Sequence, residues 1–235
     1  MATAVFTARL ETDPTQVVVN GKEQVQAHAS IKTSTPESLP VIVRAWISNK
    51  GTGPGPQLRT KKKDSLVLIT GEASIGEKDT DADGYLILAI NTICDATNDQ
   101  FINDFTAIGY LGKDPKIAEK STSNSLGVSR WPGGKKTTSW FQIRGFGFNS
   151  DKLKDPDGCP KGTLVEVNGM IDARKNKEGK LYPEVKLRSL ISQKKKRGDS
   201  MADPSKDSSA AGYDHSQFTG EQDQVNDMPT SQSWN

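Results

Sequence analysis

Short apolar runs recur along the chain as far as Ile191 and are separated by glycine, proline, asparagine and charged residues. No long segment among them has the 3.6-residue periodicity of an amphipathic helix. Runs of β-branched and apolar residues at hairpin-like spacing are typical of a β-sandwich or a β-barrel. The pattern therefore predicts an all-β chain. The expected strands are residues 4–10, 16–20, 24–31, 39–47, 65–75, 85–93, 105–111, 139–148, 162–173 and 182–191.

The order of these runs repeats once along the chain. VIVRAWI, SLVLITGEASI and YLILAINTI in the first half correspond to FQIRGFG, TLVEVNGMIDA and YPEVKLRSLI in the second. Residues 44–46 fall where 144–146 fall, and Gly71 falls where Gly169 falls, at offsets near 100 residues. The repeat predicts two tandem domains of one architecture, and a five-stranded barrel suits a chain of this length.

The composition changes after Ile191, where KKKR opens a stretch with few apolar residues that cannot bury a core. From Asp199 onward there are seven acids and one lysine, a net charge of −6. Since the whole chain has a net charge of +2, residues 1–198 together carry +8. A basic body suggests a polyanionic partner. The predicted domains are residues 1–98, residues 99–192 and a disordered acidic tail, 193–235.

The segment TTSWFQIRGFGF, residues 137–148, places aromatic residues beside glycine and arginine. Side chains alternate between the two faces of a strand, so Phe141 and Ile143 share the face that can fill a core. A ring next to a cation suits a nucleobase and its phosphate. The alternative is an ordinary strand between apolar layers, with the arginine reaching solvent at an edge. The strand face opposite Phe141 and Ile143, on which these two interpretations differ, carries Trp140, Gln142, Arg144, Phe146 and Phe148.

Four motifs in the second half resemble the bacterial single-stranded DNA-binding protein family. They are INDFTAIGYLGKDPKI, SRWPGGKKTTSWFQIRGFGF, KGTLVEVNGMIDA and a closing EV, in the family's order over residues 101–191. The resemblance implies an OB-fold that binds single strands without reading sequence. We expect no catalysis, cofactor or metal. The predicted fold class is thus all-β, with two tandem OB-folds (five-stranded Greek-key barrels) followed by a disordered acidic C-terminal tail.

The resemblance also implies roles for individual residues. The family's stacking aromatics correspond to Trp131, Trp140 and Phe146, and its phosphate-contacting residues to Lys135, Lys161, Arg174 and Lys175. A fourth family aromatic is replaced by Asn176, so one stacking platform is missing. The strand face and the neighbouring basic loop add Phe148 to the stacking candidates and Lys136 and Arg144 to the phosphate-binding candidates.

The first half admits two interpretations. Trp46 and Arg44 share a strand face by alternation, which predicts a stacking ring beside a phosphate contact. Phe6 and Tyr85 are further candidate rings, and the lysines at 61–63 supply electrostatic help at most. The alternative is that Trp46 is buried against a partner chain and this half serves mainly for dimerisation.

The C-terminal end DMPTSQSWN is similar to the acidic tip with which the family docks replication and repair proteins. It keeps an Asp-x-Pro fragment and an aromatic residue near the end. Family members with two OB-folds per chain assemble as dimers that present four folds, so the resemblance implies a homodimer. The candidate docking residues are Asp223, Asp227, Met228, Pro229 and Trp234.

Other function classes have less support in the sequence. The chain has only two histidines, His28 and His215, and a nuclease would have to use carboxylates such as Glu166, Asp172 and Glu184. An RNA-binding or protein-interaction OB-fold is the main alternative to single-stranded DNA binding.

Two cysteines far apart, Cys94 and Cys159, predict free thiols in a reducing cytoplasm. The N-terminus has no signal-peptide pattern. The protein is therefore expected in the cytoplasm, associated with the nucleoid, or in the host cytoplasm if a phage encodes it.

Overall fold

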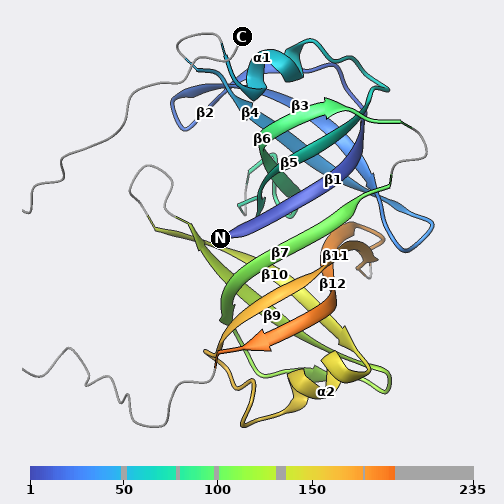
Figure 1. Ribbon diagram of the computed structural model, residues 1–235, viewed down its shortest axis with the longest axis vertical. Coiled ribbons are helices and arrows are strands. Elements are labelled where there is room, and N and C mark those ends of the chain that lie inside the picture. Colours follow the sequence, from blue (N-terminus) through green and yellow to red (C-terminus); the bar gives the residue numbers. More distant parts are fainter. Residues whose placement is uncertain (49–51, 78–79, 98–100, 131–135, 177, 194–235) are drawn as a thin grey trace, which may run out of the picture. The chain divides into compact units, whose positions relative to one another are not determined.

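The computed structural model describes residues 1–48, 52–77, 80–97, 101–130, 136–176 and 178–193 (Figure 1). These residues belong to one compact unit, Met1–Lys194. They form twelve strands and two short helices in the described ranges. Of the predicted acidic tail, 193–235, residues 194–235 lie outside the described residues.

The first half closes into a five-stranded ring. In spatial order it consists of β1 (Ala2–Leu10), β3 (Lys22–Lys32), β4 (Ser38–Trp46), β6 (Leu86–Asp95) and β5 (Leu66–Ile75). β1 closes the ring by pairing with both β3 and β5. The β4–β6 pair is parallel and the others are antiparallel. The remaining elements are β2 (Thr15–Val19), which extends β3, and α1 (Pro54–Arg59) between β4 and β5.

The second half repeats this ring. Its strands are β7 (Asn103–Leu111), β9 (Ser121–Arg130), β10 (Thr137–Phe146), β12 (Leu181–Ser192) and β11 (Leu164–Lys175). β7 closes the ring on β9 and β11, and β10–β12 is again the parallel pair. The additional elements are β8 (Lys116–Ile117) and α2 (Phe148–Lys154). The all-β prediction is confirmed, as are the two tandem barrels expected from the internal repeat and the OB-fold that the family resemblance implied.

Gly71 and Gly169, matched by the repeat, mark the same shift in strand register in the two barrels. The register of β5 on β6 shifts between Thr70 and Gly71, and that of β11 on β12 shifts between Asn168 and Gly169. A Cβ atom at Gly71 would lie 2.2 Å from the carbonyl oxygen of Ala89, and one at Gly169 would lie 2.3 Å from that of Lys186. Glycine is needed at both positions because the neighbouring backbone approaches so closely.

The strand ladders relate the two barrels residue by residue. Gly71 lies opposite Ala4, and Gly169 lies opposite Phe105, so Ala4 and Phe105 are structurally equivalent. Following the ladders around each ring gives the same kind of match for the other strands. Three equivalences used below are Arg9 with Tyr110, Ser30 with Gly127, and Pro40 with Trp140.

The two barrels are joined through their first strands. β1 and β7, blue and green in Figure 1, pair antiparallel over Ala2–Phe6 and Asn103–Ala107. The equivalent residues Ala4 and Phe105 face each other at the centre of this ladder. The barrels thus share one hydrogen-bonded sheet, and the domain boundaries at residues 98 and 192 stay a prediction.

Inward-facing side chains fill the barrels with apolar residues. Phe105 and Phe141 are fully buried, with their ring centroids 5.0 Å apart. Burying a phenylalanine side chain stabilises a fold by about 1.5–3 kcal/mol. Phe6 is also fully buried, so its interpretation as a surface ring was wrong. In β1 the buried residues Ala4 and Phe6 alternate with the partly exposed Thr3 and Val5, so the Phe6 side chain lies on the face of the strand that points into the core.

Both cysteines are free thiols, as predicted; Cys94 is exposed and Cys159 is buried. Burial raises the pKa of the Cys159 thiol. No helix in the described ranges is long and apolar enough to cross a membrane.

Candidate nucleic-acid interface

The alternation predicted for β10 is present in the structure. Trp140 and Phe146 are 52% and 43% exposed, whereas Phe141 and Ile143 between them are buried. Arg144 lies on the same face as the two exposed rings. The outer face of this strand therefore presents two aromatic rings to solvent, which is the surface that base stacking requires.

The Trp140 ring rests on two glycines. A Cβ atom on Gly112 would lie 2.3 Å from Cζ3 of the Trp140 ring, and one on Gly127 would lie 2.9 Å from Cζ3 and Cη2. Gly127 is the cross-strand partner of Trp140 on β9. Because neither glycine has a side chain, the indole can lie directly against the strands, which fixes its orientation before a ligand arrives.

Tyr110 is a surface aromatic residue that the sequence analysis missed. It is 53% exposed on β7 and pairs with Gly127, so Tyr110 and Trp140 flank the same glycine from its two neighbouring strands. The signal was available: in NDFTAIGYL the inward positions Phe105 and Ala107 alternate with outward Ile108 and Tyr110. Tyr110, Trp140 and Phe146 together are called the aromatic surface below.

Phe148 does not belong to the β10 face. The strand ends at Phe146, Gly147 has a φ of 49°, and Phe148 begins α2. The alternation count therefore stops two residues earlier than expected. Phe148 is 72% exposed, and Lys152 Nζ lies 4.6 Å from the centroid of its ring. It stays a stacking candidate on a different element.

Arg144 is engaged by a carboxylate. Its Nε and Nη2 atoms donate to the two oxygens of Glu184 at 2.7 and 3.1 Å, and Nη1 donates to the Ser121 hydroxyl at 3.0 Å. Arg174 Nη1 donates to the same Glu184 carboxylate at 2.8 Å. Burial raises the pKa of Glu184, and Arg174 opposes that rise. Two predicted phosphate ligands thus share one acid, and the charge they offer a phosphate is reduced.

The other predicted cations fall into three groups. Lys161 and Lys136 lie on the exposed surface. Lys175 forms an ion pair with Glu37 of the first barrel at 2.7 Å, which lowers the pKa of Glu37. Lys135 lies outside the described residues. The stacking candidate Trp131 also lies outside them, as do the five candidate docking residues Asp223, Asp227, Met228, Pro229 and Trp234.

One cation near the exposed rings was missed in the sequence analysis: Lys186 Nζ lies 5.5 Å from the centroid of the Phe146 ring.

The first barrel keeps part of this arrangement. Trp46, equivalent to Phe146, is 52% exposed and lies over Gly53, and Arg44 shares its strand face. Arg44 Nε donates to Gln26 Oε1 at 2.7 Å, and burial lowers the pKa of Arg44. Among the described residues no carboxylate forms an ion pair with Arg44. Unlike Arg144, Arg44 is therefore not neutralised by an acid from the described part of the chain.

The other first-half candidates are less accessible or already paired. The Tyr85 ring packs edge-on against His28 at 6.3 Å. Lys61 forms an ion pair with Asp95 at 2.7 Å. At the position of Trp140 the first barrel has Pro40, so it does not repeat this candidate stacking residue.

Two of the three carboxylates considered for a nuclease have partners within the protein. Glu184 is held by two arginines, and Asp172 accepts hydrogen bonds from the backbone N–H and hydroxyl of Ser34. No group of three or more His, Cys, Asp or Glu side chains in the described ranges could hold a metal ion.

The two closed barrels with an aromatic outer face define a tandem OB-fold protein. No protein-family model matches the sequence, and no curated protein matches it. Among solved structures, the chain is similar to wild-type single-stranded DNA binding protein from Thermus aquaticus, with a TM-score of 0.60 and 15% identity over 88% of this chain and 98% of that chain. A deletion mutant of the same protein gives a TM-score of 0.59 and 12% identity, covering 85% and 98%. These similarities show that the fold is shared.

The Glu184 contacts lead to a prediction for the variant Glu184→Gln. Losing this acid leaves Arg144 and Arg174 free to contact phosphates, so the slope of log K against log salt is expected to steepen by up to about 1.4, at 0.7 per phosphate contact. Because the pKa of Glu184 is raised above its ordinary value of 4.5, binding by the parent protein is expected to strengthen as pH falls toward that raised value. The variant should lose this pH dependence.

Oligo-dT titrations over a salt series at pH 5 to 8 measure both effects. Glu23→Gln removes the same charge from an exposed position on β3 of the first barrel and serves as the control. An unchanged salt slope in the Glu184→Gln variant, with the fold intact by circular dichroism, would show that Arg144 and Arg174 do not contact phosphates of the bound DNA.

Proposed function

We propose that this protein binds single-stranded DNA without sequence preference. The observation that supports this most directly is the aromatic surface of the second barrel, where Trp140, Tyr110 and Phe146 are each about half exposed. Every nucleobase has a π-face, so stacking on such rings is tolerant of sequence. The similarity in fold to a single-stranded DNA binding protein from Thermus aquaticus agrees with this function.

The cations around the rings favour a strand with a phosphate backbone. Lys186 lies beside Phe146, and Lys161 and Lys136 are exposed on the same barrel. Lysine and arginine contacts to phosphates follow the backbone without reading bases, and they make binding weaken with salt. The proposed role is to coat and protect single strands during replication, recombination or repair.

The decisive experiment is a titration with oligo-dT in a Trp234→Phe background, which removes the C-terminal tryptophan from the signal. Quenching of tryptophan fluorescence that weakens steadily with salt is expected. Absence of quenching at low salt would reject the proposal and favour the alternative of a protein-interaction module. Labelled strands incubated with magnesium should stay intact, because we propose a binding protein and not a nuclease. The same titration with an RNA oligomer measures the preference for the sugar.

We further propose that the chain forms a homodimer that presents four OB-folds, and that its acidic C-terminal segment recruits replication and repair proteins in the cytoplasm. The dimer is supported by the resemblance in sequence pattern, and light scattering that gives a monomer mass would contradict it. For the acidic segment, deletion of residues 226–235 should remove partners from a pull-down out of the native cytoplasm. An unchanged set of partners would reject that part of the proposal.

A further inference from the structure

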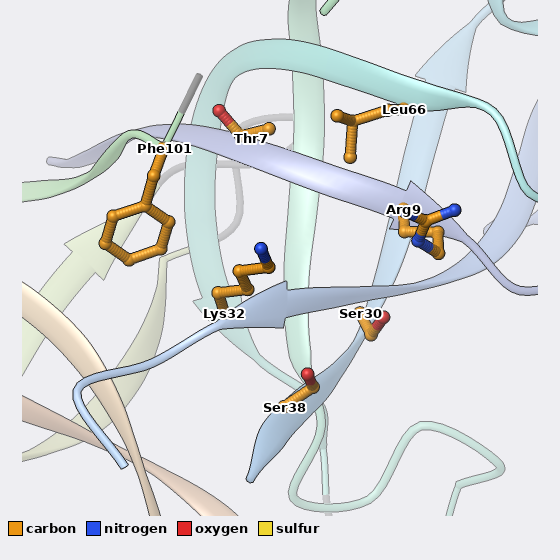
Figure 2. A pocket seen from close by; sticks show the side chains of 7 residues that line it. All are labelled: Thr7, Arg9, Ser30, Lys32, Ser38, Leu66 and Phe101. Carbon is orange, nitrogen blue, oxygen red and sulfur yellow. The ribbon is translucent and has the colours of Figure 1, made fainter. Parts of the chain in front are cut away.

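A small open cavity lies in the first barrel at the place where β1 separates from β3. β1 pairs with β3 only over Ala8–Leu10, and toward its N-terminus it leaves β3 and pairs with β7. The cavity has a volume of about 70 Å³, several times the roughly 10–15 Å³ that one water molecule needs. It is lined by Thr7, Arg9, Ser30, Lys32, Ser38, Leu66 and Phe101 (Figure 2).

The cavity combines two cations, three hydroxyl groups and one aromatic ring. Arg9 and Ser30 are cross-strand partners, as are Lys32 and Ser38. In Figure 2 the Lys32 ammonium group and the Phe101 ring project into the space beneath Thr7. Glu11 Oε1 accepts a hydrogen bond from the Ser30 hydroxyl, and Arg9 Nη1 donates to the backbone carbonyl of Asp64 at 3.3 Å. Among the described residues the lining itself carries two cations and no carboxylate, which suits an anion of phosphate size.

The backbone next to Phe101 is held in place by hydrogen bonds of Ile102. The Thr7 N–H donates to the Ile102 carbonyl at 2.9 Å, and the Ile102 N–H donates to Thr7 Oγ1 at 3.2 Å. The next residue, Asn103, is buried and donates to the Lys32 carbonyl at 3.0 Å. These bonds fix the backbone on both sides of the cavity. Phe101 nevertheless stays 50% exposed, so its ring is available at the rim.

The second barrel has different residues at the equivalent positions. Arg9 corresponds to Tyr110, a ring of the aromatic surface, and Ser30 corresponds to Gly127, against which the Trp140 ring lies. Thr7 corresponds to Ile108, which is 46% exposed. The first barrel therefore has a cationic surface where the second has an aromatic and apolar one, and Phe101, from the segment that connects the barrels, supplies a ring from outside the repeat.

We propose that this cavity binds one nucleotide unit of a single strand, with a backbone phosphate held by Arg9 and Lys32 and the attached base stacked on Phe101. The site rests on the proposed function and adds to it a location in the first barrel, whose role the sequence left open. The cavity is too small for a base and its sugar, so the base lies outside it, against the exposed ring.

Photocrosslinking with the full-length protein tests the site directly. The probe is a roughly 32-nucleotide oligo-dT, long enough for two OB-folds, in which some thymines are replaced by 5-iododeoxyuridine, and peptide mass spectrometry locates the adducts. An adduct on Phe101 is expected. Adducts on Trp140 or Phe146 without one on Phe101 would overturn the site and leave the proposed function standing. No adduct on any aromatic residue would count against both.

A charge variant tests the phosphate contacts. Arg9→Gln combined with Lys32→Gln is expected to make the salt slope shallower by about 0.7, because the two residues hold one backbone phosphate and each lost phosphate contact removes about 0.7. Saturating quenching of tryptophan fluorescence should be unchanged. The matched control, Lys22→Gln with Lys120→Gln, removes two charges from exposed positions at hairpin turns. An equal change in the control, or no change in the Arg9 and Lys32 variant, would overturn the assignment.

Discussion

Replacing Trp140 with alanine is expected to weaken binding to oligo-dT about 5- to 150-fold. One stacked base contributes about 1–3 kcal/mol, and each 1.4 kcal/mol is a tenfold change in affinity. The indole is half exposed and rests on Gly127 and Gly112, so its truncation removes a preorganised platform and little of the core. Fluorescence anisotropy of labelled oligo-dT measures the change without depending on the tryptophan signal.

Matched variants separate stacking from general disturbance. Tyr110→Phe should keep its affinity, since stacking needs the ring and not the hydroxyl, whereas Tyr110→Ala should lose affinity. Val18→Ala truncates a 69% exposed apolar side chain on β2 and should change nothing. Gly127→Ala should weaken binding while keeping Trp140, because the new Cβ atom would lie 2.9 Å from the ring and displace it. If the Trp140→Ala variant binds oligo-dT as tightly as the parent protein, the DNA does not bind at the aromatic surface.

Replacing Gly169 with alanine is expected to destabilise the fold by about 3 kcal/mol or more. The added Cβ atom would lie 2.3 Å from a backbone carbonyl oxygen on β12, which cannot move aside as a flexible side chain can. Overpacking typically costs about 1–3 kcal/mol, and a clash with backbone belongs at the upper end. In a unit of this size each kcal/mol lowers the melting temperature by about 2–4 °C, so a fall of at least roughly 6–12 °C is expected.

Gly71→Ala should have a similar effect, because its Cβ atom would lie 2.2 Å from the carbonyl oxygen of Ala89 at the equivalent place in the first barrel. Thr70→Ala is the control: it removes an outward hydroxyl that bonds Thr92 at 2.6 Å and adds no atoms. Thermal unfolding followed by circular dichroism compares the three. Melting temperatures of the glycine variants within about 2 °C of the parent would mean that the strands relax around the extra methyl group.

The sequence predicted the fold and one face of the site because those depend on alternation and repetition. Phe141 and Ile143 inward, with Trp140 and Phe146 outward, follow from a period of two residues in a strand. The equivalence of Gly71 and Gly169 followed from the repeat alone. These features are local, so no coordinates were needed to find them.

β9 was missed because half of its inward face is polar. Thr122 and Asn124 are buried on the same face as Leu126 and Val128, so only two apolar positions of the alternation mark the strand from Ser121 to Arg130. Tertiary contacts make this possible: the Thr122 hydroxyl lies 2.8 Å from that of Ser150 in α2. Neither short helix was predicted. The first begins with a proline directly after Gly53, which is a typical start signal, but its six residues are too few to show helical periodicity.

The charge state of the site could not be predicted from the sequence. Arg144 and Glu184 are forty residues apart, and only the parallel pairing of β10 with β12 brings them together. The same holds for the cavity of Arg9, Lys32 and Phe101, which exists because β1 leaves β3 to join β7. Pairings between distant segments decide which cations are neutralised and which are free.

The ladder between β1 and β7 has a two-fold pattern that an assembly of identical chains would make with two copies of one strand. Residues equivalent by the repeat exchange places across it: Thr3 faces Thr106, and Val5 faces Asp104. In an isologous interface between identical subunits every residue must serve on both sides at once. Here the two sides are separate stretches of one chain, so Arg9 and Tyr110 can differ although they occupy the same place. A single polypeptide thereby escapes the constraint of symmetry, and its two barrels are free to specialise.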